Sequence, residues 1–222
     1  MEFSEIMRKL AFLSVLPGLL LAGAAHAEGE VLLDYRDTAF TSGQAFYAQP
    51  DRRRIAALLK TASPEAARDM GETFAILGDA DGTFANGSGR VYLIQSRAPA
   101  AIEPFPDGPA PVLLVTGQGE AAQLFRLPPD VQYQRLVAAA DGNGDGRDEV
   151  LLEASFTNMG QTTTALDVIR LEADGTAKPA QTLRDVTLDA CDNPSGERTR
   201  SAATVRIGPE GFEAKPHALP CP

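Results

Sequence analysis

The chain has 222 residues and a net charge of −10, with 30 acidic and 20 basic side chains. This acidic balance argues against the basic face that phosphate backbones require, so we expect no nucleic-acid partner. The length suits one domain with a sizeable core, or two small ones.

The N-terminus has the pattern of a secretory signal peptide. Arg8 and Lys9 precede an apolar run that is shorter than the ~20 residues of a membrane-spanning helix. The segment Ala25-His26-Ala27 fits the small-x-small cleavage pattern. We therefore expect a signal peptide over 1–27 and a secreted domain over 28–222, periplasmic or extracellular, without a stable membrane anchor after cleavage. The alternative is that the segment stays uncleaved as an anchor.

Residues 50–70 predict two short helices. Ile55, Leu58 and Leu59 recur at helical spacing. Ser63 and the proline after it have the pattern of a helix cap followed by a first-turn proline. Gly71 would end the second helix.

From residue 72 onward the pattern indicates strands separated by turns. We expect strands over 73–77, 90–95, 112–116, 123–127, 133–139, 150–156, 162–171, 182–188 and 204–207. A proline-rich segment at 98–111 predicts a loop. The predicted fold is mainly β and antiparallel (blade-like, a sandwich or a partial propeller), with one or two short N-terminal helices. The domain would have a helical part over 28–70 and a β part over 72–222.

The acidic loop 141–149, DGNGDGRDE, is the strongest functional signal. Its oxygen-bearing side chains recur at alternate positions, and a tightly curled loop turns alternate side chains toward its centre. The interleaved glycines permit that curl because they adopt positive φ without steric cost. Hard oxygen donors in a flexible loop suit Ca²⁺, whereas Mg²⁺ demands tighter octahedral geometry. The predicted metal ligands are Asp141, Asn143, Asp145, Arg147 through its backbone carbonyl, and Glu149.

The spacing of this loop differs from that of an EF-hand. An EF-hand requires a glutamate at position 12 and a helix on each side, but position 12 here is Leu152 and the flanks are predicted strands. The segment DGNGDGRDEVLL instead resembles the calcium loop of FG-GAP and VCBS-type repeats, which occur in integrin-α-like β-propellers. The resemblance implies Ca²⁺ bound by the same five residues. Only one complete copy occurs, which favours a single blade-like unit in a smaller β domain. The alternative is a glycine-rich hairpin turn without metal.

The remaining chemistry is sparse. Cys191 and Cys221 are the two cysteines, and an oxidising compartment favours a disulfide between them. His217 is the single histidine beyond the predicted signal, which argues against multi-histidine zinc sites and Ser-His-Asp catalysis. We therefore expect a non-catalytic calcium-binding domain that acts as a binding or scaffold module, with a protein or glycan partner. A metal-dependent hydrolase and an envelope or inhibitor-like protein without metal are the alternatives.

Overall fold

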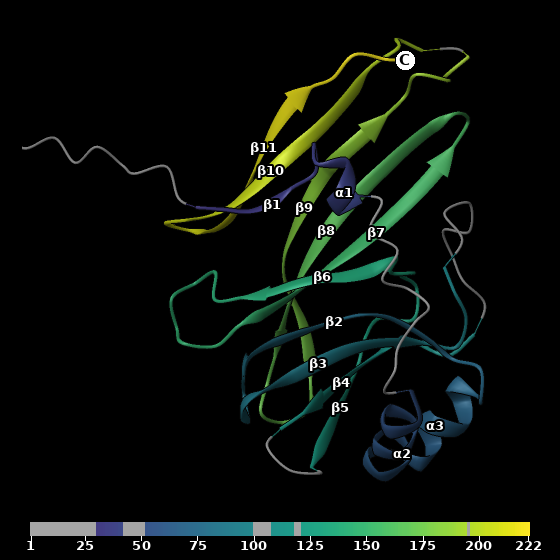
Figure 1. Cartoon of the computed structure of the whole chain (residues 1–222), viewed down its shortest axis with the longest axis vertical. Coiled ribbons are helices and arrows are strands. Elements are labelled where there is room, and N and C mark those ends of the chain that lie inside the picture. The colour runs from purple at the N-terminus through teal and green to yellow at the C-terminus, as the bar shows by residue number, and fades with distance from the viewer. Residues whose placement is uncertain (1–29, 42–51, 100–107, 118–120, 195) are drawn as a thin grey trace, which may run out of the picture.

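A computed structural model describes residues 30–41, 52–99, 108–117, 121–194 and 196–222. The predicted signal peptide at 1–27 and the middle of the proline-rich segment lie outside these residues. The fold is mainly β, as predicted, and its strands form two antiparallel sheets (Figure 1). No described helix is long and apolar enough to cross a membrane.

The two predicted helices are confirmed, and a third is added. Helices α2 (Arg52–Ala62) and α3 (Pro64–Met70) follow one another. The Ser63 hydroxyl caps α3 by accepting a hydrogen bond from the Ala66 N–H at 3.1 Å. Gly71, at a φ of 73°, ends the helix. The additional helix, α1 (Thr38–Thr41), is a single turn that follows the first strand.

The smaller sheet is a four-stranded meander in the order β2-β3-β4-β5. The strand β2 continues through the whole of the GDADGTF segment, beyond the predicted 73–77. A bulge between Ile76 and Asp79 allows this extension, since Gly78 has a φ of 108° and lies directly against the Leu136 carbonyl. The strands are β2 (Ala75–Phe84), β3 (Gly87–Gln95), β4 (Val112–Thr116) and β5 (Ala122–Arg126).

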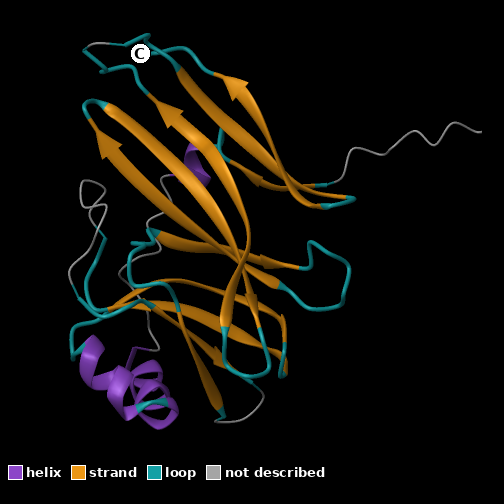
Figure 2. Cartoon of the chain, turned by 180° about the vertical axis from the view of Figure 1, so that it is seen from behind, coloured by secondary structure: helices purple, strands orange, loops and turns teal. Residues whose placement is uncertain are grey.

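The larger sheet has seven strands and curls around its inner face (Figure 2). Its order is β1-β10-β9-β8-β7-β6. The strands β1 and β9 pair with different halves of the same edge of β10, and β11 pairs with the opposite edge. The β11 strand was absent from the sequence prediction. The strands are β1 (Val31–Asp34), β6 (Arg135–Ala140), β7 (Glu149–Asn158), β8 (Gln161–Leu171), β9 (Ala177–Asp189), β10 (Arg200–Gly208) and β11 (Gly211–Ala218).

Three hydrophobic cores lie one after another in space along the molecule. The first packs α2 and α3 against the outer face of the small sheet, and includes Ile55, Leu59 and Ile94. The second lies between the two sheets. The third lies beneath β1 and α1, on the face of the large sheet that is turned away from the small sheet, which we call the inner face. The strand β8 serves two cores, because Ile169 faces the small sheet while Leu166 faces inward.

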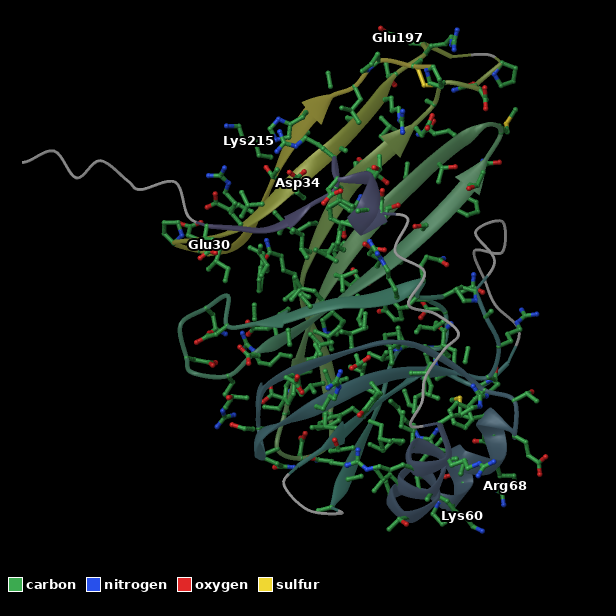
Figure 3. The ribbon with its side chains drawn as sticks, viewed as in Figure 1. Glu30, Asp34, Lys60, Arg68, Glu197 and Lys215 are labelled. Atoms are coloured by element: carbon green, nitrogen blue, oxygen red, sulfur yellow. A yellow bond between two sulfur atoms is a disulfide. The ribbon has the colours of Figure 1, made fainter. Side chains whose placement is uncertain are left out.

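The predicted disulfide is confirmed. Cys191 and Cys221 are bonded, with their Cα atoms 5.5 Å apart. The bridge ties the end of the chain to the segment after β9. Figure 3 shows its yellow bond near Glu197, at the end of the molecule opposite Lys60 and Arg68. Cys191 is 7% exposed, so the bridge is partly sheltered by the surrounding protein.

Candidate functional site

The acidic loop 141–149 joins β6 to β7 and passes close to two other hairpins. It leaves β6 at the edge of the large sheet and returns through Glu149, the first residue of β7 (Figure 1). Residues 143–147 are exposed, while Gly142 and Glu149 are buried. The flanking elements are strands, as the sequence predicted, and the loop therefore has the strand–loop–strand arrangement.

Asp141 organises the loop by accepting backbone hydrogen bonds. Its Oδ1 accepts from the N–H of Gly144 at 2.7 Å and of Asp145 at 3.2 Å, and its Oδ2 accepts from the N–H of Gly146 at 2.8 Å. These amides, that of Gly146 above all, lower the pKa of the Asp141 carboxyl below its usual value. Because the folded pKa is lowered, this carboxylate stabilises the loop at neutral pH, and the contribution is lost as the pH falls through the folded pKa.

The next two predicted ligands continue the same pattern. Asn143 Oδ1 accepts from the Asp145 N–H at 2.8 Å, and Asp145 Oδ1 accepts from the Arg147 N–H at 2.9 Å. Each is a side-chain-to-backbone turn over two residues. Positive φ angles of 74° at Gly144 and 83° at Gly146 make the intervening curl possible.

Glu149 forms the buried base of the loop. It is 3% exposed, and its two carboxylate oxygens accept from the Gly142 N–H at 3.0 Å and from Asn143 Nδ2 at 2.7 Å. Arg170 on β8 lies 3.5 Å from Glu149 Oε1. This glutamate therefore closes the loop on itself from the first position of β7.

Two contacts that the sequence did not predict join the loop to other parts of the fold. Asp148 Oδ2 accepts from the Thr83 N–H at 2.6 Å, and the Asp148 N–H donates to the Thr83 carbonyl at 2.7 Å. Thr83 belongs to β2 of the small sheet. Gly142 packs so closely on the Phe212 ring of β11 that a Cβ would lie 2.2 Å from it.

The five predicted ligands fit Ca²⁺ in the kind and spacing of their donors. Four present side-chain oxygens in one loop, and Arg147 offers its carbonyl, as a hard cation prefers. Apart from the ion pair of Glu149 with Arg170, their side chains contact the loop's own donors. Within the described ranges, no three Asp, Glu, His or Cys side chains form a group able to hold a metal ion. Asp141 Oδ1 accepts two backbone hydrogen bonds, but Asp141 Oδ2, Asn143 Oδ1 and Asp145 Oδ1 each accept one and keep a second lone pair. Binding would thus require the carboxylates to converge while the backbone curl is kept.

Comparison with known protein families, curated proteins and solved structures found no match to this chain. The resemblance to the FG-GAP and VCBS-type calcium loop thus rests on residues 141–149 and the strands beside them. The partner residues Thr83 and Phe212 were not predicted as part of the site, because each is more than 50 positions away in the sequence. Their pairing depends on how the two sheets pack.

Proposed function

We propose that this protein is a secreted, non-catalytic calcium-binding domain that serves as a binding or scaffold module. One observation supports the proposal most strongly: the loop that bears the predicted ligands also contacts both sheets. Asp148 bonds to β2 of the small sheet, and Gly142 packs on β11 of the large one. An ion that ordered this loop would therefore stabilise the arrangement of the two sheets.

The environment of the loop favours a structural role for the ion over a catalytic one. The carboxylate oxygens of Asp141 and Glu149 already accept hydrogen bonds from within the loop. Two hollows in the described part of the protein, of about 500 and 240 Å³, are lined by residues outside the loop. A catalytic metal keeps an open coordination position that faces a substrate cleft. These contacts therefore support the binding module rather than the hydrolase.

Secretion is proposed on two grounds. The N-terminal segment has the pattern of a cleavable signal peptide. The Cys191–Cys221 disulfide is typical of proteins that fold in an oxidising compartment. A structural calcium site also suits such a compartment, because extracellular modules bind Ca²⁺ with dissociation constants of about 10⁻⁴ to 10⁻³ M.

Calcium titration by isothermal calorimetry tests the proposal. We expect one Ca²⁺ per chain, and Asp145→Asn should weaken binding by at least about tenfold, because it removes a charged ligand worth about 1.4 kcal/mol or more. Asp174→Asn is the matched control. Asp174 also begins an Asp-Gly turn and accepts a backbone N–H, that of Thr176 at 3.0 Å, but lies in the β8–β9 hairpin. Equal binding by wild type and Asp145→Asn would refute the assignment.

A further inference from the structure

A polar cavity of about 240 Å³ lies on the inner face of the large sheet, below the segment that joins β1 to α1. Its lining residues come from the turn after β1, from the end of α1, from the residue before β6 and from the four strands β6 to β9, and the acidic loop contributes none of them. Six of the lining residues are Tyr35, Arg135, Glu153, Ser155, Thr164 and Thr187.

The cavity begins where the inner face changes from apolar to polar. Along β7, Leu151 belongs to the inner core, and the next residues on the same face are Glu153 and Ser155. On the adjacent strand β8, Leu166 belongs to the same core, and Thr164 is its neighbour on the same face, toward the cavity. The apolar core on the inner face therefore stops at these positions, and polar side chains line the cavity beyond it.

Three hydroxyl groups form a row across three adjacent strands. Ser155 Oγ lies 2.9 Å from Thr164 Oγ1, and Thr187 Oγ1 donates to the same Thr164 oxygen at 2.8 Å. Thr164 is 7% exposed. Each hydroxyl has one donor and two acceptor lone pairs, so this row retains hydrogen-bonding capacity toward the cavity.

The charges that line the cavity neutralise each other. Arg135 donates from Nε and Nη2 to the two oxygens of Glu153, at 2.6 and 2.7 Å. Its Nη1 donates to the Phe40 carbonyl at 2.7 Å. The bidentate pair leaves no net charge on this wall, which favours a neutral ligand over an anion or a cation.

Tyr35 provides an independent indication of a ligand. The residue is 4% exposed, and its buried hydroxyl makes no hydrogen bond of ordinary geometry within the described part of the chain, although the Glu153 carboxylate lies close enough to interact with it. Leaving a buried hydroxyl unpaired is costly, so native structures nearly always pair them. Tyr35 packs edge-on against Phe40 with ring centroids 5.2 Å apart, and this contact holds the phenol at the cavity.

We propose that this cavity binds a neutral, polyhydroxylated small molecule of about monosaccharide size. The Tyr35 hydroxyl and the Ser155–Thr164–Thr187 row would be its hydrogen-bond partners. The volume agrees, because drug-sized ligands occupy larger pockets of about 300–1,000 Å³. This site goes beyond the calcium role and does not depend on it, since none of its lining residues belongs to the loop.

Ligand-observed NMR and calorimetry with defined sugars test the site. The probes are D-glucose, D-galactose, D-mannose, their methyl glycosides and myo-inositol, with D-glucuronate and D-glucosamine as charged counterparts. We expect at least one neutral probe to bind with unit stoichiometry, equally with calcium and with chelator. Binding of a methyl glycoside as tight as that of its free sugar would indicate the end of a glycan; preference for the free sugar would indicate a free ligand.

Three substitutions locate the binding. Tyr35→Phe and Thr164→Val should each weaken it by about tenfold, the loss of one good hydrogen bond. Thr162→Val is the control, because Thr162 lies on the same face of β8 and its hydroxyl pairs with that of Thr157 at 2.9 Å, outside the cavity lining. Tyr35→Phe should leave the melting temperature of the free protein close to that of the wild type, since the hydroxyl makes no hydrogen bond of ordinary geometry there.

The proposal is overturned if no neutral probe binds at millimolar concentration or if only the charged probes bind. Binding that survives both Tyr35→Phe and Thr164→Val would also overturn it, because the ligand would then lie elsewhere. Because every titration is repeated in chelator, failure of the calcium site and failure of the sugar site give different results.

Discussion

Replacing Arg135 by methionine is expected to lower the free energy of unfolding by about 3–5 kcal/mol, because it leaves the buried Glu153 carboxylate without its partner. The side chains of the pair are only 12% and 7% exposed. The guanidinium also stacks on the Phe40 ring, 4.4 Å from its centroid, so the substitution removes a contact between α1 and the sheet. Denaturant unfolding followed by circular dichroism measures the change.

Arg200→Met is the matched control for this prediction. Arg200 and Asp189 are also directly opposite each other on neighbouring antiparallel strands, but their side chains are 41% and 48% exposed. An exposed pair contributes about 1 kcal/mol or less. The double variant Arg135→Met with Glu153→Leu should recover most of the loss, since it removes the unpaired charge. Equal losses for Arg135→Met and Arg200→Met would contradict the role given to burial.

Removing the disulfide is expected to cost roughly 3–4 kcal/mol, from the chain entropy regained by an unfolded loop of this length. The two cysteines are 30 residues apart, and the loop between them includes β10 and β11. For a chain of this size, such a loss lowers the melting temperature by about 10 °C. Cys191→Ser with Cys221→Ser, followed by differential scanning calorimetry, measures the effect.

Reductant provides the control for the disulfide. It should lower the melting temperature of the wild type to that of the double serine variant and leave the variant unchanged. The hydrogen bonds from Arg198 Nε to the Cys191 carbonyl and from the Leu219 N–H to the Arg200 carbonyl, both 2.8–2.9 Å, still hold the ends of the loop. A wild type that melts at the same temperature with and without reductant, with its thiols shown to be free, would contradict the prediction.

Local signals predicted much of the fold. Ser63 and Gly71 set the limits of α3 through interactions within one turn, which the sequence displays directly. The apolar run Val112–Thr116 is a strand over the predicted residues, because both of its faces are buried. The acidic loop and the strands on each side of it were also predicted, because the pattern of the loop and the apolar residues of its flanks are local properties of the sequence.

Long-range features could not be predicted in the same way. The last strand, Gly211–Ala218, is paired along its length with β10, yet its sequence contains Pro216 and charged residues that are typical of an edge. Asp148 bonds to β2 only because the two sheets meet there. Alternating Glu153, Ser155 and Thr157 could have indicated a polar buried face, but period-two polarity usually indicates a solvent-facing side.

The central claim, a calcium ion bound by the loop 141–149, is tested most directly by thermal unfolding with calcium and with excess chelator. At free calcium about 100 times the dissociation constant, binding should add about 2.7 kcal/mol and raise the midpoint by several degrees. The shift should vanish in Asp145→Ala and persist in Asp174→Ala. Superimposable curves for the wild type in calcium and in chelator would contradict the claim, leaving the loop as a hairpin connection stabilised by its own hydrogen bonds.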